Sequence, residues 1–305
     1  MDTQELTLAP RILWFTPAEI GWQCLAETAC ECDREPTTEY IPIRSMAIRS
    51  ALRKSNIGWK HTWRRLVEEY AQLKLTRQTD RLPALSGLAK AVQRNLQPND
   101  QYLFGLWRND LDRQLLWASG CKYPGLAPDC SRIELDDGSD YVPSWSWASV
   151  TGSLIFWRHH PLKDQHWPFT WKILDFQVSR TGLNLYGPGT GWIDIEGPLI
   201  QLEMKETKLT TLGSSYRTEF SPDPTYLEPC SLVGKTVFLF VALSGKFNNI
   251  FTSIGLVLIR LHDKGVGLFR RAGLLHVFAT PENTDSEWNL WLDGLTSSRT
   301  QLRLI

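Results

Sequence analysis

The chain has 305 residues, of which 42% are hydrophobic and 22% charged, and its 33 basic and 33 acidic residues give a formal net charge of zero. This length predicts one large or two modest domains with a substantial core. The balanced charge argues against a nucleic-acid partner, which usually requires a basic excess, and no apolar run approaches the roughly 20 residues that span a bilayer.

The N-terminal part predicts two short strands followed by a loop. Residues 8–16 indicate a strand after a proline turn, and residues 17–24 indicate a turn that leads into a second strand. Residues 28–42 are polar, contain two prolines and favour a loop.

From Trp59 onward the apolar residues follow a helical period. The residues expected on one buried face are Trp59, Trp63, Leu66, Val67, Tyr70 and Leu73. A second helix is expected to begin near Asp80, with Thr79 or Asp80 as its cap and Pro83 in the first turn, where no backbone donor is needed. A third helical pattern has apolar residues four apart: Leu103, Trp107, Leu111 and Leu115.

After about residue 140 the pattern becomes that of strands. Trp145 and Trp147 alternate with small residues, so both rings are expected to project from one face of a strand. Further strands are expected at 153–157, 169–178, 192–204, 236–243, 253–261, 266–279 and 287–292. The polar stretch 205–235 favours a long loop. The predicted fold class is α+β, with a small helical layer followed by an antiparallel β-rich module.

No local motif predicts an active site. Residues 187–191 are glycine-rich, but strand alternation follows them where a phosphate-binding loop needs a helix, so a hairpin turn is expected. Cys24, Cys30 and Cys32 lack metal-binding spacing and have no nearby His. No secretory signal is visible in the first 25 residues, so we expect a cytoplasmic protein with reduced thiols. We expect no catalytic residue, no cofactor and no metal.

Several short blocks together suggest a family. They are Trp63–Tyr70 with Asp80–Ala89, Tyr102–Arg108, Leu115–Trp117, Pro143–Ser149, and Gly255–Leu258 with Phe269–Leu274. In this order they resemble the region that follows the HET domain in fungal heterokaryon-incompatibility proteins. At the N-terminus, Gln4, Glu5 and the stretch 8–15 resemble the last part of the HET domain, whose earlier motifs have no counterpart here.

This resemblance predicts the organisation of the chain. Residues 1–42 are expected to be a remnant of the end of a HET domain in a truncated or degenerate form, 43–139 a helical region and 140–305 a β-rich C-terminal module. The family-motif residues, expected to be structural, are Gln4, Glu5, Pro10, Arg11, Asp80, Arg81, Leu82, Pro83, Gly87, Gly105, Trp107, Pro143, Trp145 and Trp147.

The resemblance implies a non-enzymatic protein of fungal non-self recognition that binds an unknown protein partner. Because the HET domain is the part that resembles TIR-type signalling domains, no such activity is assigned to this chain. The 14 tryptophans leave an alternative open, a carbohydrate-binding Trp-rich β module. That alternative requires Trp145, Trp147, Trp167 or Trp171 to line an open groove. An enzyme that uses scattered residues such as His61, Glu69 and Asp80 is a third reading, which no spacing supports.

Overall fold

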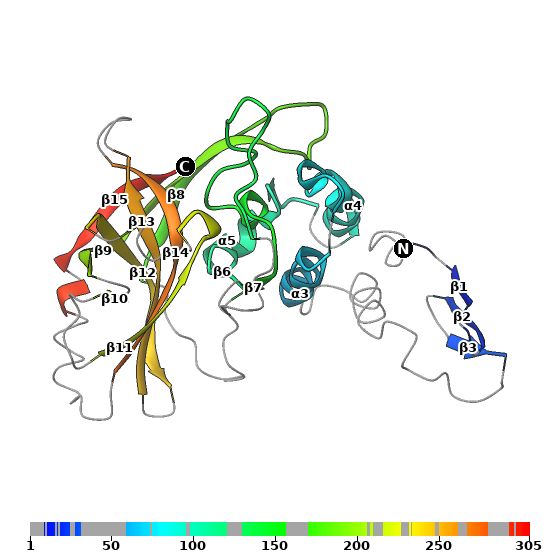
Figure 1. The fold of residues 1–305 in the computed structure, drawn as a ribbon, viewed down its shortest axis with the longest axis horizontal. Coiled ribbons are helices and arrows are strands. Elements are labelled where there is room, and N and C mark those ends of the chain that lie inside the picture. Colours follow the sequence, from blue (N-terminus) through cyan, green and yellow to red (C-terminus); the bar gives the residue numbers. More distant parts are fainter. Residues whose placement is uncertain are drawn as a thin grey trace.

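The fold is known from a computed structural model (Figure 1). The structure describes residues 9, 11–15, 17, 19–24, 28–31, 59–73, 75–95, 98–120, 130–156, 170–205, 208–209, 216–226, 232, 234–247, 250–261, 267–279, 293–295 and 297–305. In this part of the chain, no helix has the length and apolarity needed to cross a membrane.

A small antiparallel sheet forms at the N-terminal end. Its strands, in spatial order, are β1 (Arg11–Phe15), β2 (Ile20–Cys24) and β3 (Thr28–Cys30). The two expected strands are confirmed, whereas the loop expected over 28–42 begins with a third strand, because Thr28–Cys30 pairs with Gly21–Gln23. Figure 1 shows this sheet beyond α3 and α4, on the side away from the large sheet.

The first long helix, α3 (Trp59–Ala71), matches the expected apolar face. The five apolar residues from Trp59 to Tyr70 are buried, but Leu73 lies beyond the helix end and is 44% exposed, so its expected burial is wrong. The carboxylate of Glu68, also buried, accepts a hydrogen bond from the backbone N–H of Phe156 at 2.8 Å. This bond ties α3 to β7 (Leu154–Phe156).

The second helix begins later than expected. Two 3₁₀ turns, η1 (Gln78–Asp80) and η2 (Pro83–Leu85), precede α4 (Ser86–Asn95). Pro83 lies in the first turn of η2 as predicted, but Asp80 is exposed and caps neither turn. In a continuous helix the Thr79 carbonyl would accept from residue 83, and proline has no N–H. The Tyr141 hydroxyl donates to that carbonyl instead, at 2.7 Å.

The third expected helix is mostly replaced by a hairpin. Strands β4 (Tyr102–Leu103) and β5 (Leu106–Trp107) pair across a turn in which Phe104 and Gly105 have φ values of 49° and 96°. Two consecutive positive φ angles are typical of a tight hairpin turn and interrupt a helix. Only the turn η3 (Arg108–Asp110) and the short helix α5 (Leu111–Gln114) follow.

The strand expected around Trp145 and Trp147 is also wrong. This segment is a turn that continues into the 3₁₀ turn η4 (Trp147–Ser149). The Ser146 hydroxyl accepts a hydrogen bond from the backbone N–H of Ala148 at 3.0 Å and so caps η4. A side-chain bond of this local kind competes with strand pairing.

The β-rich module contains one large sheet. Its strands are β8 (Lys172–Arg180), β9 (Gly189–Lys205), β10 (Lys208–Leu209), β11 (Tyr216–Pro222), β12 (Thr236–Phe247), β13 (Ile250–Arg260), β14 (Leu268–Ala279) and β15 (Arg299–Leu304). β10 and β11 lie in the expected 205–235 loop, which is therefore wrong at these positions, because Tyr216–Pro222 pairs with β14. The strand expected at 287–292 falls outside the described residues.

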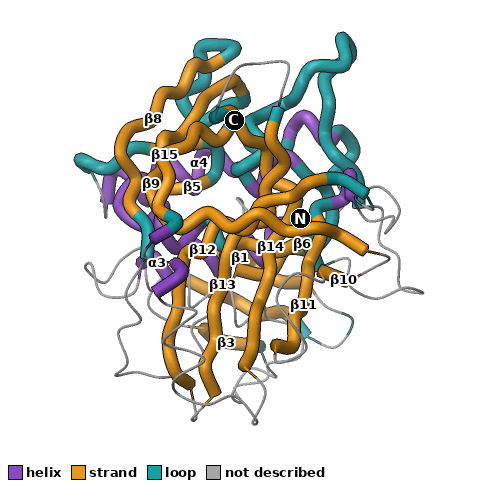
Figure 2. The backbone as a smooth tube through the Cα atoms, turned by 90° about the vertical axis from the view of Figure 1, so that its left-hand side faces the viewer, coloured by secondary structure: helices purple, strands orange, loops and turns teal. Residues whose placement is uncertain are grey.

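Strand pairing closes part of this sheet into a ring. Strands β9, β12, β13 and β14 are successive antiparallel neighbours. β15 lies between the two outer strands of this series and completes the ring, because it pairs antiparallel with β9 and parallel with β14. Figure 2 shows β12, β13, β14 and β11 side by side. The α+β class with an antiparallel β-rich module is confirmed.

One buried cluster joins the helical region to the sheet. It includes Trp63 and Leu85 from the helices, Trp145 from the turn, and Phe240 and Leu256 from the strands. Short strand β6 (Trp117–Ser119) pairs with β7 beside this cluster. A second, smaller cluster lies on the other face of the sheet, around Leu239 and Val257. Residues on both sides of position 140 therefore share a core.

Candidate functional site

Three of the family-motif blocks meet at one backbone carbonyl. The indole N–H groups of Trp63 and Trp147 both donate to the Gly105 carbonyl, each at 3.0 Å. Trp63 and Trp147 are buried, and a Cβ on Gly105 would lie 2.5 Å from Nε1 of Trp147. We call Trp63, Gly105 and Trp147 the tryptophan junction. These three residues contact one another in the buried interior.

Arg81 lies against this junction without an acidic partner. Its side chain is buried, its Nη2 donates to the Gly152 carbonyl at 3.4 Å, and its guanidinium carbon lies 5.2 Å from the Trp147 ring centroid. Burial lowers the pKa of Arg81 to about 10, and interactions with Tyr70 and Tyr141 oppose this shift. None of the described carboxylates forms an ion pair with Arg81, and because its pKa of about 10 is well above 7, Arg81 is a buried cation at neutral pH.

The remaining motif residues fall into three groups. Leu82, Trp107, Pro143 and Trp145 are buried, whereas Pro83 and Gly87 are half-buried, and Arg11 and Asp80 are exposed. Arg11 lies on β1 and Gly87 on α4, and neither takes part in the tryptophan junction. Gln4, Glu5 and Pro10 lie outside the described residues. The structure thus brings together Arg81, Gly105 and Trp147, and places Arg11 apart from them on β1.

A second buried arginine connects the sheet to the helical region. Arg271 on β14 donates from Nη1 to Asp223 Oδ1 at 2.6 Å and from Nη2 to the Trp117 carbonyl. Its guanidinium carbon lies 3.4 Å from the Trp117 ring centroid, and its backbone N–H donates to the Ser144 hydroxyl at 3.1 Å. Burial raises the pKa of Asp223, while the charge of Arg271 opposes this effect.

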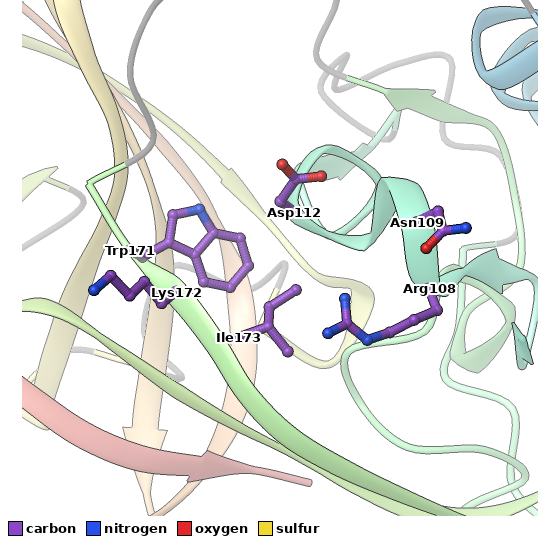
Figure 3. A pocket seen from close by; sticks show the side chains of 6 residues that line it. All are labelled: Arg108, Asn109, Asp112, Trp171, Lys172 and Ile173. Carbon is purple, nitrogen blue, oxygen red and sulfur yellow. The ribbon is translucent and has the colours of Figure 1, made fainter. Parts of the chain in front are cut away.

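A pocket with charged walls lies between α5 and β8. It has a volume of about 400 Å³ and is lined by Arg108, Asn109, Asp112, Trp171, Lys172 and Ile173. Figure 3 shows the Arg108 and Asp112 side chains on the side of the helical turns that faces Trp171 and Ile173. The Lys172 and Asn109 side chains point away from this space (Figure 3). Two opposite charges therefore face an apolar wall.

The helical wall of the pocket is held by hydrogen bonds. The Asp100 carboxylate accepts from the backbone N–H groups of Asn109 and Gln101 at 3.0 and 2.8 Å, and Lys60 Nζ donates to the Asn109 carbonyl at 2.5 Å. Burial raises the pKa of Asp100, and these two backbone donors oppose the shift. The Arg108 guanidinium lies over the Phe176 ring, 5.4 Å from its centroid.

The sheet wall is held equally firmly. Next to Trp171, the Thr170 N–H donates to the Ala242 carbonyl at 3.0 Å and the Thr170 hydroxyl to the Val241 carbonyl at 2.6 Å. The Trp171 ring packs edge-on against Phe240, with centroids 5.7 Å apart. Both walls are therefore set before any ligand arrives.

The sequence did not identify this pocket. Arg108 belongs to the motif block Tyr102–Arg108, and the sequence suggests for Trp171 only a role as a ring that stacks on a sugar. Because the two walls come from segments about 60 residues apart, no local spacing predicts their contact. The residue pattern around Arg108 predicts a helix and carries no signal of a pocket.

The rings proposed for carbohydrate binding are poorly placed for that role. Trp145 and Trp147 are 0% exposed and offer no face for stacking on a sugar, whereas Trp171 is 5% exposed and lines the pocket between α5 and β8. Trp167 lies outside the described residues. Of the three described rings, Trp171 alone lines an opening, and the carbohydrate alternative therefore depends on it.

The cysteines partly contradict the expectation of reduced thiols. Cys130 is disulfide-bonded, whereas Cys24 and Cys30 are thiols. In the ranges that the structure describes, no group of three or more His, Cys, Asp or Glu side chains has the geometry of a metal site. Cys32 lies outside those ranges.

Comparisons of the chain with protein-family models, with curated proteins and with solved structures find no match.

Proposed function

We propose that this protein is a non-enzymatic recognition protein of the heterokaryon-incompatibility type that binds a protein partner. The tryptophan junction is the observation that carries the proposal. The residues behind the family resemblance are engaged with one another: Gly105 accepts from Trp63 and Trp147, and Arg81 packs on Trp147. Such contacts support a scaffold role for the motif.

An exposed apolar surface supports binding to a protein. On one face of β1 and β2, Leu13, Phe15 and Ile20 are 54%, 76% and 40% exposed. Phe15 and Ile20 are directly opposite each other in the strand pairing, so the apolar side chains are contiguous. Contiguous exposed apolar side chains are common at protein contacts.

The non-enzymatic part is tested with purified protein and NAD⁺. We expect no consumption of NAD⁺ above the rate in buffer. Turnover that co-purifies with the chain and changes when pocket residues Arg108 or Asp112 are substituted would contradict the proposal.

Partner binding is tested by purification of the tagged chain from a filamentous fungus. A specific partner should be retained by the unmodified chain and lost from a Leu13→Ser/Phe15→Ser variant. Leu183→Ser/Leu185→Ser is the matched control, because these leucines are also strongly exposed but lie in the turn between β8 and β9. Equal retention by all three proteins would contradict the assigned surface.

We also propose a cytoplasmic location. The disulfide at Cys130 argues against it, because disulfides are rare in reducing compartments. Cell fractionation distinguishes a cytoplasmic from a secreted location, and recovery of the protein in the secreted fraction would overturn the cytoplasmic assignment.

A further inference from the structure

Two opposite charges in the pocket between α5 and β8 are not paired with each other. Arg108 and Asp112 are four residues apart, a spacing at which opposite charges commonly pair on a helix. Among the described residues, no ion pair involves either side chain. The guanidinium contacts the face of the Phe176 ring, and one Asp112 oxygen accepts from the backbone N–H of Arg113 at 2.9 Å.

Both groups therefore keep hydrogen-bonding capacity. A guanidinium has five N–H donors and a carboxylate has two acceptor oxygens. Of the nearby acids, Asp100 already accepts two backbone N–H groups through Oδ1, and Glu196, opposite Lys172, accepts from Arg299 and Gln301. The donors of Arg108 and the second oxygen of Asp112 remain for a ligand.

The opposite wall is apolar. Trp171 and Ile173 face the two charged groups across the cavity (Figure 3). The volume of about 400 Å³ is in the range of small-molecule sites. A matching ligand is small and carries one anionic group, one cationic group and an apolar body.

We propose that this pocket binds a small zwitterion of the apolar α-amino acid class. The ligand carboxylate pairs with Arg108, its ammonium pairs with Asp112, and its side chain lies against Trp171 and Ile173. The inference goes beyond the proposed function, which requires only a protein partner, and either can fail without the other.

Three fluorinated probes separate the contributions of the two charges. They are para-fluorophenylalanine, para-fluorophenylpropanoate, which lacks the ammonium, and para-fluorophenethylamine, which lacks the carboxylate. Their affinities for the full chain are measured by fluorine NMR titration. The amino acid should bind about tenfold more tightly than either analogue, which is the effect of about 1.4 kcal/mol from one additional ion pair. Equal affinity of the three probes, or binding of none, would overturn the proposal.

Substitutions then assign each charge to its residue. Arg108→Gln should weaken the amino acid and the propanoate about tenfold and leave the amine no weaker. Asp112→Asn should weaken the amino acid and the amine, and tighten the propanoate, because it removes a carboxylate from the pocket lining. Misfolding cannot produce such opposite changes.

Arg94→Gln is the matched control, because Arg94 is exposed on α4 and does not line the pocket. It should leave all three affinities unchanged. The proposal is wrong if Arg108→Gln and Asp112→Asn weaken the three probes to the same extent, or if Arg94→Gln has the effect expected of Arg108→Gln.

Discussion

In the large sheet, long backbone ladders supply the hydrogen bonds, whereas around the tryptophan junction side chains from distant segments supply several of them. β12, β13 and β14 pair through long ladders. Near the tryptophan junction, the Ser146 hydroxyl donates to the Phe104 carbonyl at 2.6 Å, and the Trp117 indole donates to the Trp145 carbonyl at 3.0 Å. One substitution of such a side chain therefore leaves a backbone carbonyl near the tryptophan junction without that donor. A strand within a ladder keeps its backbone hydrogen bonds when a single side chain is replaced.

The two buried arginines give the largest test of this comparison. Arg271→Met should lower the free energy of unfolding by about 4 kcal/mol, because it leaves Asp223 as a buried carboxylate without its partner. Arg81→Met should change the free energy of unfolding by less than about 1 kcal/mol, since Arg81 has no described acidic partner that would be left buried without its counter-charge. Urea unfolding measures both.

A double variant controls for the volume change at Arg271. Arg271→Met/Asp223→Leu should recover most of the lost stability, because no buried charge remains. Equal losses for Arg81→Met and Arg271→Met would show that the ion pair is not the reason for the difference.

Gly105→Ala tests the helical region at its most constrained position. The substitution combines a positive φ of 96° with a Cβ placed 2.5 Å from Trp147 Nε1, and we expect a loss of about 3 kcal/mol. Gly138→Ala is the control, since its φ is 77° with nothing within 4 Å, and it should cost only about 1 kcal/mol. Thermal and urea unfolding compare the stabilities of the two variants. Similar losses of stability would show that the contact with Trp147 does not add to the cost at Gly105.

The shared acceptor predicts coupling between two tryptophans. Trp63→Phe and Trp147→Phe each leave the Gly105 carbonyl one donor, but the double variant leaves it with neither indole. The double variant should therefore lose about 1 kcal/mol more than the sum of the single losses. A double-mutant cycle measures this term, and strict additivity would mean that the two bonds are independent.

The smallest expected effect is a pH dependence at Asp110. Burial raises the pKa of Asp110 above its ordinary 3.8, with Arg64 and Gln114 opposing the shift. Because the folded state holds this proton more tightly than the unfolded chain, its contribution is present at low pH and is lost as pH rises through the raised pKa. Asp110→Asn should remove this downward slope, which is at most about 1.4 kcal/mol per pH unit. Unfolding curves from pH 3 to 7 test it, and an unchanged slope would contradict the assignment.

The same contrast explains what the sequence could predict. Strand β9 was located closely because buried and less buried residues alternate around Ile193 and Ile195, and β13 because it contains a short, continuously apolar and buried run. The hairpin at Tyr102–Trp107 and the turn η4 were missed because a positive φ at Phe104 and a side-chain cap from Ser146 decide them. The pocket required knowledge of which segments meet, and neither Arg108 nor Trp171 carries that information locally.

The position of β15 in the ring has a consequence for synthesis. β9 and β14 are joined through residues 299–304, which are translated after all the other ring strands. A nascent chain held at the ribosome before this point exposes two unpaired strand edges, which are prone to pairing with other chains. The vulnerable interval for aggregation therefore lasts until β15 emerges from the exit tunnel.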